Sequence, residues 1–368
     1  MLRKKIAVIF GGRSGEHVVS LRSAASIMDA IDTERYEVIP VGITREGVWL
    51  SGPDVWLSLW EDREPDQSYR TALITDPTNP GLLIKANALK SEWRFQPLDL
   101  AFPVLHGTYG EDGTIQGLFE MAGIPYVGSG VLASSSSMDK VVMKILFAQA
   151  GLPVAPYLYF YRRQWSGSEE FWQEKVATAL GFPCFVKPAN LGSSVGISKV
   201  KEPEELAPAV EEALLYDEKV IIETYIEGRE IECAVLGNIN AETSRPGEVI
   251  PCNEFYDYRA KYIDDRSTLV IPVELGEKLE QQVKEYSLKS FQAVEASGLA
   301  RVDFFVDTVN GSVTINEINT MPGFTSISMY SKLWGACGVN YSMLVSRLME
   351  LAEERFQRRS SLLHKPPE

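Results

Sequence analysis

Oxygen-bearing side chains gather in two apolar runs near the C-terminal end of the chain. Asp303 lies in the first run, "ARVDFFVD", and Glu317 and Asn319 lie in the second, "SVTINEIN". A turn that contains Asn310 and Gly311 joins the runs, which predicts a β-hairpin. Residues two apart face the same side of a strand, so Glu317 and Asn319 share a face. Two acids and an amide are the oxygen ligands that Mg²⁺ or Mn²⁺ takes when it also binds substrate phosphates.

The turn decides whether Asp303 lies on that same face. A two-residue Asn-Gly turn places Asp303 and Glu317 on opposite faces, whereas a three-residue loop of residues 309–311, with a left-handed Gly311, places them together. Two carboxylates in strands this apolar cannot stay unpaired in a dry interior. We therefore expect the second register, or a bulged equivalent, and a divalent-cation site. An exposed sheet face with ordinary surface carboxylates is the alternative.

Basic side chains near phosphate-binding patterns form a second group of candidates. Arg301 precedes Asp303 by two residues, and its fixed fork suits a phosphate or a developing oxyanion. In "FVKPANLGSSVGISKV" (185–200), Lys187 ends a short apolar strand, and "GSSVG" offers backbone N–H groups to phosphate oxygens. The glycines of a P-loop precede the lysine, so this order is not a P-loop. Lys140, at a helix start, is a second phosphate candidate; ordinary exposed lysines and a plain turn are the alternative.

Two glutamates flank a connection between strands in "IIETYIEGREIE" (221–232). Backbone groups of such a hinge could meet the edge of a base, while Glu223 and Glu230 take an exocyclic amine and ribose hydroxyls. Two solvated glutamates are the alternative for this stretch alone.

The elements that must position these residues alternate between strands and helices. Strands are predicted at 5–12, 36–44 and 98–107 and helices at 14–31 and 114–123, which favours a parallel α/β sheet over about residues 1–130. Residues 51–70 are polar and irregular and predict an insertion or a loose hairpin. A serine run then leads into a helix that ends at Gly151, which resembles a domain entrance. An α+β module follows to about residue 228, and a third region contains the hairpin and helices at 277–298 and 340–359.

Length and composition restrict the class of protein. A chain of 368 residues predicts two or three domains, here 1–130, 131–228 and 229–368. The net charge of −14 argues against nucleic acid or an anionic membrane as a partner. The apolar run "IAVIF" fits a buried strand better than a signal peptide. Four cysteines without C-x-x-C spacing predict reduced thiols and a cytoplasmic location.

Taken together, these residues resemble a known superfamily. Lys140, Lys187, "GSSVG", Glu223 with Glu230, and "RVD…NEIN" stand in the order seen in ATP-grasp carboxylate–amine ligases. The resemblance implies two α+β domains that clamp ATP, with the lysine on a strand before a phosphate-covering loop. Within the superfamily, "GGRSGEHVVSLRSA", "LHGTYGEDGTIQG", "FYDYRAKY" and "NEINTMPGFTSIS" are similar to segments of the D-alanine–D-alanine ligase family over about residues 4–350.

The resemblance implies a reaction and a role for each matching residue. ATP phosphorylates the carboxylate of one D-alanine, and the amine of a second D-alanine displaces the phosphate, giving a dipeptide for peptidoglycan precursors. The implied ATP ligands are Lys140, Lys187, Glu223, Ile226 and Glu230. The implied ligands of two Mg²⁺ or Mn²⁺ ions are Asp303, Glu317 and Asn319.

The remaining implied roles concern the amino-acid substrates. Glu16 holds the ammonium of the first D-alanine, and His106 belongs to the same substrate site. Ser193 and Tyr262 close two loops over the substrates together with Glu16, and Lys261 reaches the transferred phosphate. Arg301 and the backbone N–H of Gly323 form an oxyanion hole, and Ser328 receives the carboxylate of the second substrate. The family also implies a homodimer.

Two rival functions share the same fold. A D-alanine–D-lactate ligase uses a hydroxyl nucleophile, but its relatives usually change the loop that reads "FYDYRAKY" here. A non-catalytic nucleotide-binding regulator would have lost a metal ligand or a phosphate lysine, and all are present. One departure from the family concerns the adenine site: Thr224 and Tyr225 stand where some relatives carry a lysine after the glutamate, which bears on nucleotide affinity.

Overall fold

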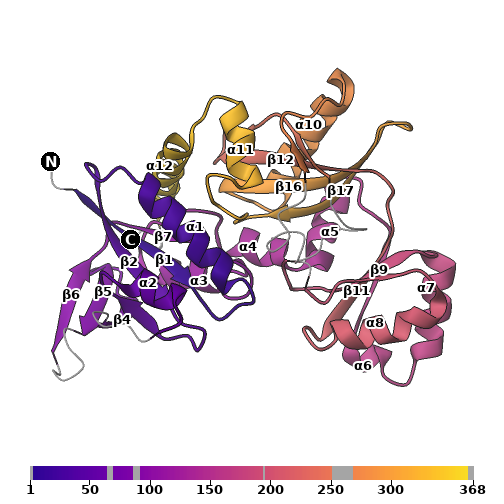
Figure 1. Ribbon diagram of the computed structural model, residues 1–368, viewed down its shortest axis with the longest axis horizontal. Coiled ribbons are helices and arrows are strands. Elements are labelled where there is room, and N and C mark those ends of the chain that lie inside the picture. Colours follow the sequence, from indigo (N-terminus) through magenta and orange to yellow (C-terminus); the bar gives the residue numbers. More distant parts are fainter. Residues whose placement is uncertain (1–2, 64–68, 86–91, 194, 251–267, 364–368) are drawn as a thin grey trace.

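Three β-sheets follow one another along the chain (Figure 1). The computed structural model describes residues 3–63, 69–85, 92–193, 195–250 and 268–363. The sheets contain seven, four and six strands in chain order, and helices pack between and around them. This combination of α/β and α+β regions confirms the predicted fold class.

The first sheet has the strand order β6-β5-β4-β3-β2-β1-β7. Its region comprises β1 (Lys4–Gly11), α1 (His17–Ala30), β2 (Tyr36–Ile43), β3 (Trp49–Ser51), α2 (Val55–Trp60), β4 (Tyr69–Ile74), β5 (Gly81–Lys85), β6 (Trp93–Pro97), β7 (Leu100–Pro103) and α3 (Thr114–Ala122). Only β2, β1 and β7 pair in parallel, and the other four pairings are antiparallel. The prediction of a parallel sheet over residues 1–130 is therefore right for two of the six strand pairings and wrong for the other four. A parallel neighbour needs a long crossover such as α1, whereas the short connections after β2, β4 and β5 permit only antiparallel pairing.

The described residues of the polar stretch 51–70, which are 51–63, 69 and 70, form regular structure where an insertion or a loose hairpin was predicted. They form α2, and β4 begins at Tyr69. The Trp56 indole N–H donates to the carbonyl of Leu21 at 2.8 Å, and Val55 is fully buried. Apolar contacts at Val55, Trp56 and Leu59 thus hold a short helix against α1 and β2 despite polar neighbours in the sequence.

The second sheet has the order β10-β9-β11-β8. Its region comprises α4 (Val131–Met138), α5 (Lys140–Gln149), β8 (Tyr157–Tyr161), α6 (Arg162–Trp165), α7 (Glu169–Ala179), β9 (Cys184–Pro188), β10 (Ser198–Val200), the 3₁₀ helix η1 (Pro203–Glu205), α8 (Leu206–Ala213) and β11 (Lys219–Thr224). The serine run lies inside α4, where Ser135 and Ser136 donate back to carbonyls of the preceding turn. Asp139 ends α4 and caps α5, which is the helix predicted to follow the serine run and begins at Lys140. The serine run itself forms a further helix that the sequence analysis did not predict.

The third sheet has the order β15-β14-β12-β16-β17, with β13 paired to β12. Its region comprises β12 (Arg229–Gly237), β13 (Glu242–Thr243), β14 (Gly247–Ile250), β15 (Thr268–Val270), α10 (Glu277–Ala293), β16 (Gly298–Asp307), β17 (Ser312–Asn319), α11 (Met329–Ala336) and α12 (Tyr341–Ser360). In β16 buried and half-buried residues alternate, because one face packs on the core beneath α10 and the other faces a cavity.

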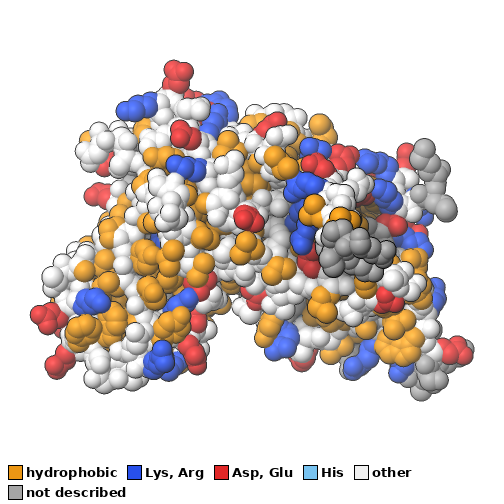
Figure 2. Space-filling view, turned by 180° about the vertical axis from the view of Figure 1, so that it is seen from behind, with side chains coloured by type: hydrophobic (Ala, Val, Ile, Leu, Met, Phe, Trp, Pro, Cys, Tyr) orange, Lys and Arg blue, Asp and Glu red, His pale blue; other side chains and the backbone are white. Residues whose placement is uncertain are grey.

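The first and third regions share one hydrophobic core, and α5 of the second region packs into the core of the third sheet through Met143 and Phe147. One apolar cluster joins β1 and α1 of the first sheet to α11 and α12 at the C-terminal end, whereas the second sheet has a cluster of its own with α7 and α8. A deep notch separates the lobe of the first sheet from the lobe of the second in the view from behind (Figure 2). The predicted domain boundaries remain predictions. Among the described residues, no helix combines the length and the apolar composition needed to cross a membrane.

Candidate functional site

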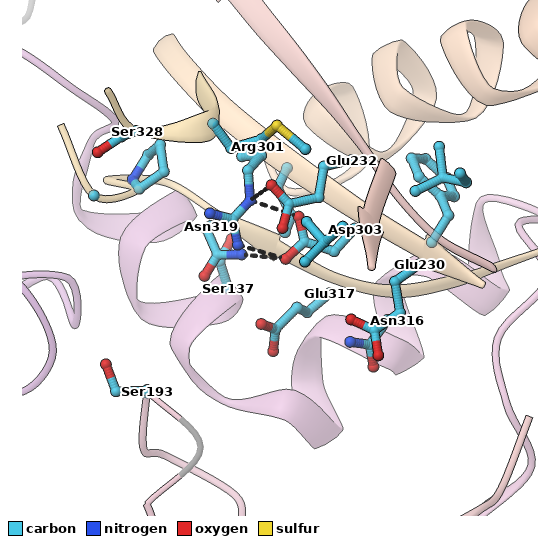
Figure 3. A pocket seen from close by; sticks show the side chains of 18 of the residues that line it. Ser137, Ser193, Glu230, Glu232, Arg301, Asp303, Asn316, Glu317, Asn319 and Ser328 are labelled. Atoms are coloured by element: carbon cyan, nitrogen blue, oxygen red, sulfur yellow. Dashed lines mark hydrogen bonds and ion pairs between the residues drawn. The ribbon is translucent and has the colours of Figure 1, made fainter. Parts of the chain in front are cut away.

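The candidate site is a cavity of about 1040 Å³ where the three regions meet. Side chains from all three regions line it: Glu16 and His106 come from the first region, Lys187 and Glu223 from the second, and Arg301 from the third. Figure 3 shows that the acidic group of the third sheet lies at one end of this cavity, with Ser193 and Ser328 apart from it. The basic and acidic candidates from distant parts of the sequence thus share one space.

The acidic corner of the cavity is built by the hairpin of β16 and β17. Asp303 pairs with Glu317, and Arg301 pairs with Asn319, so all four side chains lie on one face. This confirms the register in which Asp303 joins the other two ligand candidates. The turn that joins the strands differs from the predicted three-residue loop, because it contains four residues, 308–311. Gly311 is left-handed (φ +70°), as predicted.

A β-bulge restores the register that the longer turn would shift. Between the pairs Asp303–Glu317 and Phe304–Ile315, Asn316 is the extra residue on β17. Without this residue, Glu317 would fall on the core face beside Ile315. The bulge therefore turns Glu317 toward the cavity, where Figure 3 shows it beside Asp303.

Arg301 lies in this corner as predicted, and its guanidinium is ion-paired with carboxylates. Its Nε and Nη2 donate to the two carboxylate oxygens of Asp303, each at 2.7 Å, and Nε also lies 2.9 Å from Glu232 Oε2 (Figure 3). The Asn319 amide donates to Asp303 at 3.0 Å. Burial opposes the charge of Arg301, yet Asp303 and Glu232 raise the pKa of its guanidinium well above the usual value. The arginine is therefore a fixed positive charge between two acids.

A buried cluster of one carboxylate and two ammonium groups forms the wall opposite the acidic corner. Glu223 Oε2 lies 2.8 Å from Lys187 Nζ, and Glu223 Oε1 lies 3.3 Å from Lys144 Nζ. Lys187 on β9 and Glu223 on β11 lie on the same face of the second sheet, as their pairing with Ile221 and Phe185 requires. Burial opposes ionisation of Glu223, but the two lysines outweigh it and lower the pKa of the carboxyl to about 2.

Lys140 contacts the glycine/serine loop after β9, and Ser193 is part of that loop. The Lys140 ammonium donates to the carbonyl of Leu191 in this loop. Ser193 has a positive φ of 53°, and its hydroxyl donates to the carboxylate of Glu16, which lies at the start of α1 in the first region. A Cβ on Gly192 would lie 3.1 Å from Glu16 Oε2, so the glycine permits this close approach. The loop and α1 therefore meet across the cavity.

His106 is buried near Glu16 with a complete set of partners. Its Nδ1 lies 3.0 Å from the carbonyl of Met321, and its Nε2 lies 3.1 Å from Ser23 Oγ. Glu111 Oε1 lies 3.8 Å from Nδ1. Burial disfavours the charged ring, but Glu111 and Glu16 outweigh it and raise the pKa of His106. The ring therefore joins the first region to the loop that follows β17.

The other predicted site residues also border the cavity, with two exceptions. Ile226 lies within the connection from β11 to β12, Glu230 lies near the start of β12, and Gly323 lies in the loop after β17. Ser328 caps α11 and shares a hydrogen bond of 2.8 Å with Thr325. The exceptions lie outside the described residues: they are Lys261 and Tyr262.

The acidic corner suits a divalent cation that brings further ligands with it. Among the described residues no three His, Cys, Asp or Glu side chains form a complete metal cage. Asp303, Glu317 and Asn319 supply two carboxylates and one amide oxygen on a single face. Mg²⁺ usually takes one or two carboxylates and completes its shell with water and substrate phosphates. The donor set therefore fits an ion shared with a phosphate-bearing ligand.

Three residues of the site were missed by the sequence analysis. Lys144 follows Lys140 by four residues and so shares its helix face, where the other buried positions are apolar; this break in the apolar pattern is a signal for a buried lysine. Glu232 follows Glu230 by two residues and shares its strand face. Glu111, in "HGTYGEDG", has no spacing that marks it in the sequence.

Comparisons with known proteins place the chain among ligases. The family described as "D-ala D-ala ligase N-terminus" matches residues 5–129, and "D-ala D-ala ligase C-terminus" matches residues 146–350. A D-alanine–D-alanine ligase of Heliobacterium modesticaldum is 51% identical over 97% of this chain and 96% of its own length. The corresponding protein of Natranaerobius thermophilus is 48% identical over 97% of each chain.

Solved structures of similar proteins have the same fold. The VanG D-Ala:D-Ser ligase from Enterococcus faecalis superimposes with a TM-score of 0.85 at 37% identity, covering 95% of this chain and 100% of that one. The D-alanine–D-alanine ligase from Coxiella burnetii gives a TM-score of 0.82 at 35% identity, covering 97% and 96%.

Proposed function

The chain belongs to the D-alanine–D-alanine ligase family, and from this premise we propose that it joins two D-alanine molecules at the expense of ATP. The products are D-alanyl-D-alanine, ADP and phosphate. The observation that carries the proposal is the single cavity in which Lys187 and Glu223 face Asp303, Glu317 and their neighbours, with Glu16 at the side. A nucleotide held between the two walls brings its γ-phosphate next to an amino acid on Glu16.

The second sheet supplies the nucleotide site in this proposal. Lys187 and Lys140 carry positive charge beside the glycine/serine loop, which suits a triphosphate. Glu223 and the backbone at Ile226 border the connection between β11 and β12, where they meet the adenine edge. Glu230, on β12, takes ribose hydroxyls. Tyr225 lies 6.2 Å from Phe185 between ring centroids, and aromatic packing of this kind replaces the cation found beside adenine in some relatives.

Asp303, Glu317 and Asn319 are the proposed ligands of two Mg²⁺ or Mn²⁺ ions. Bound there, the ions supply charge neutralisation for the phosphate oxygens. Each Asp303 oxygen accepts one hydrogen bond from Arg301, and a carboxylate oxygen has a second lone pair that can bind an ion. Glu232, 2.9 Å from Arg301 Nε, remains to hold the guanidinium in place.

The first D-alanine is proposed to bind between α1 and the loop after β7. Glu16 pairs with its ammonium group, and the Glu16 carboxylate is already fixed by the hydroxyl of Ser193. His106 borders the same space with a raised pKa, because Glu111 and Glu16 outweigh the effect of burial. The substrate carboxylate then points toward the nucleotide. Lys261 and Tyr262 complete this part of the proposal, although both lie outside the described residues.

The chemistry proceeds in two balanced steps. A carboxylate oxygen of the first D-alanine attacks the γ-phosphorus, the bond to the β,γ-bridging oxygen breaks, and ADP leaves with the electron pair. The amine of the second D-alanine attacks the resulting acyl carbon, the C–O bond to phosphate breaks, and the nitrogen loses a proton. Arg301 and the Gly323 N–H are proposed to stabilise the oxyanion, and Ser328 to bind the second carboxylate. Closing the cavity matters because water would hydrolyse the acyl phosphate.

The proposal extends to the cellular setting. The dipeptide is a precursor for peptidoglycan, which links the enzyme to cell-wall formation and cell shape. A cytoplasmic homodimer is part of the proposal and rests on the family resemblance alone. The relatives named above support a dipeptide product, and the D-lactate alternative has no support from them.

Phosphate release with identified products tests the proposal. We expect ATP turnover that depends on D-alanine and on Mg²⁺, with D-alanyl-D-alanine as the product, and no turnover with L-alanine. D-lactate and D-serine are offered as second substrates at several pH values. A depsipeptide as the main product at neutral pH would favour the D-lactate ligase, and turnover independent of D-alanine would contradict both ligase functions.

A further inference from the structure

Lys144 is a fully buried lysine that the proposed chemistry does not use. It lies on α5 among inward-facing apolar residues such as Met143 and Phe147, and none of its side chain is exposed. A lysine is almost never fully buried unless it is paired. Its position therefore calls for a role that outweighs the cost of removing an ammonium group from water.

The ammonium of Lys144 contacts both walls of the cavity. On the side of the second sheet, its Nζ lies 3.3 Å from Glu223 Oε1, and Lys187 binds the other oxygen of the same carboxylate. On the side of the third sheet, its Nζ donates to the backbone carbonyl of Asn316 at 3.4 Å. One side chain thus touches a proposed adenine-binding carboxylate and the strand that carries a proposed metal ligand.

Asn316 is not an ordinary strand residue. It is the extra residue of the bulge in β17, and the bulge is what turns Glu317 toward the cavity. A bulged residue leaves the regular ladder and so lacks its usual backbone partners. The donor from Lys144 therefore holds the bulge at the point where its geometry sets the direction of Glu317.

We propose that Lys144 is a positioning residue that couples the nucleotide wall to the metal corner by binding Glu223 and the Asn316 carbonyl at once. The inference rests on the proposed ligase function and adds a residue to it. With Lys144 in place, a nucleotide that meets Glu223 finds Glu317 already directed at its phosphates. The binding of nucleotide and the binding of Mg²⁺ therefore strengthen each other, as linkage between two sites requires.

Calorimetric titration with a non-hydrolysable ATP analogue, with and without Mg²⁺, tests this coupling. The variant is Lys144→Met, which keeps the unbranched shape of the side chain, one atom shorter, and removes the charge and the donors. The matched control is Lys284→Met on α10, which loses an ion pair with Glu280 outside the cavity. We expect the Mg²⁺-dependent gain in analogue affinity to fall at least about fivefold in Lys144→Met and to be unchanged in the control.

Further measurements separate positioning from a general structural role. The KM for D-alanine should stay within about twofold of the wild-type value, because Glu16 and His106 lie elsewhere in the cavity, while the KM for ATP rises. Should Lys144→Met fold poorly, Lys144→Gln serves as a second variant, since its amide is polar but carries no charge and is too short to span both partners of the ammonium.

Several outcomes would overturn the inference. One is an unchanged Mg²⁺-dependent gain in either variant, and another is an affinity loss of the same factor with and without Mg²⁺. Failure of the proposed function is distinguishable, because the wild-type protein itself would then show no D-alanine-dependent phosphate release.

Discussion

At the scale of single residues, Arg301 supplies the positive charge that neutralises the carboxylates of the acidic corner. It is bound to both oxygens of Asp303 and approached by Glu232, while Glu317 adds a third negative charge nearby. A divalent ion at Asp303 and Glu317 would compete directly with the guanidinium. If Arg301 gives up its ion pair with Asp303, its guanidinium remains paired with the carboxylate of Glu232. The corner thus stays paired with either cation.

Replacing Glu317 tests the metal corner at this scale. Glu317→Gln should lower phosphate release by at least about 100-fold, as loss of a preorganised charge at the reacting phosphate does. The free energy of unfolding of the metal-free protein should change by less than about 1 kcal/mol, because the change removes one negative charge from an acidic cluster. Turnover assays and urea unfolding measure the two effects.

Glu354→Gln, on the exposed face of α12, is the control and should change neither quantity. Phosphate release at the wild-type rate from Glu317→Gln would contradict the assignment of this residue to the metal.

The buried Glu223 cluster predicts a pH-dependent contribution to stability. Burial opposes ionisation, but Lys144 and Lys187 lower the pKa of Glu223 to about 2, from 4.5 when unperturbed. A depressed carboxyl pKa contributes stability above the unfolded value, and this contribution is lost as pH falls from about 4.5 toward 2. Glu223→Gln should therefore be destabilised by about 3 kcal/mol at pH 7. The difference from wild type should shrink as the pH is lowered below 4.5, in urea unfolding at a series of pH values; a difference that stays constant down to pH 3 would be inconsistent with the pair.

The residue types and spacing of the sequence predicted the candidate ligands more completely than the residues that contact and orient those ligands. Asp303, Glu317 and Asn319 stand out because polar side chains interrupt apolar strands at a fixed spacing. Lys144 acts through a contact with Asn316 in a distant segment, and Glu111 lies near His106 because of the way the loop between them folds. Such contacts depend on how helices and loops meet in space, which no local spacing encodes.

At the scale of elements, the β16–β17 hairpin shows where local prediction succeeds and where it ends. Burial of one strand face determined that Asp303 and Glu317 should pair, and they do. The structure places both side chains on one face through a turn one residue longer than predicted and a bulge at Asn316. The bulge compensates the shift in register that the longer turn causes. A pattern of apolar and polar residues specifies a face, but several combinations of loop length and bulge satisfy it.

Two glycines, one with a left-handed backbone and one within a helix, give a matched test at this scale. Gly311 has φ +70° in the hairpin turn, so Gly311→Ala should cost about 1 kcal/mol of unfolding free energy. Gly335 lies within α11 without a positive φ, and a Cβ there meets nothing within 4 Å, so Gly335→Ala should add about 0.5–1 kcal/mol. Denaturant unfolding measures both, and catalytic rates should stay unchanged because neither residue lines the cavity of about 1040 Å³. Equal effects of the two changes would show that backbone conformation does not set their sign.

At the scale of the whole molecule, the distribution of cores differs from the order of the sequence. The N-terminal sheet and the C-terminal helices share one apolar cluster, and Arg355 on α12 reinforces it by donating to the carbonyls of Tyr126 and Gly128. The second sheet has a separate cluster. Reading along the chain suggested three successive domains, because a sequence does not reveal that its first and last thirds pack together. Lys187 and Glu223 thus lie on the sheet with its own core, whereas Lys140 and Lys144 lie on α5, which packs into the core of the third sheet.

Two buried cysteines report on these cores separately. Cys184 belongs to the core of the second sheet and Cys233 to the core beneath α10, and burial raises the pKa of each thiol to about 11. In a Cys252→Ser, Cys337→Ser background, neither thiol should react at pH 8 until its core opens. During a urea titration we expect Cys184 to become reactive before Cys233, because the core of the second sheet does not extend into the other two regions.

Addition of an ATP analogue, Mg²⁺ and D-alanine should delay the labelling of Cys184 more than that of Cys233. A ligand that bridges the cavity ties the second sheet to the remainder of the molecule, so opening of that sheet must then release the ligand as well. Mass spectrometry of the labelled peptides distinguishes the two sites. Simultaneous labelling at every urea concentration, with and without ligands, would mean that all three regions unfold as one unit and that the separate core has no independent stability.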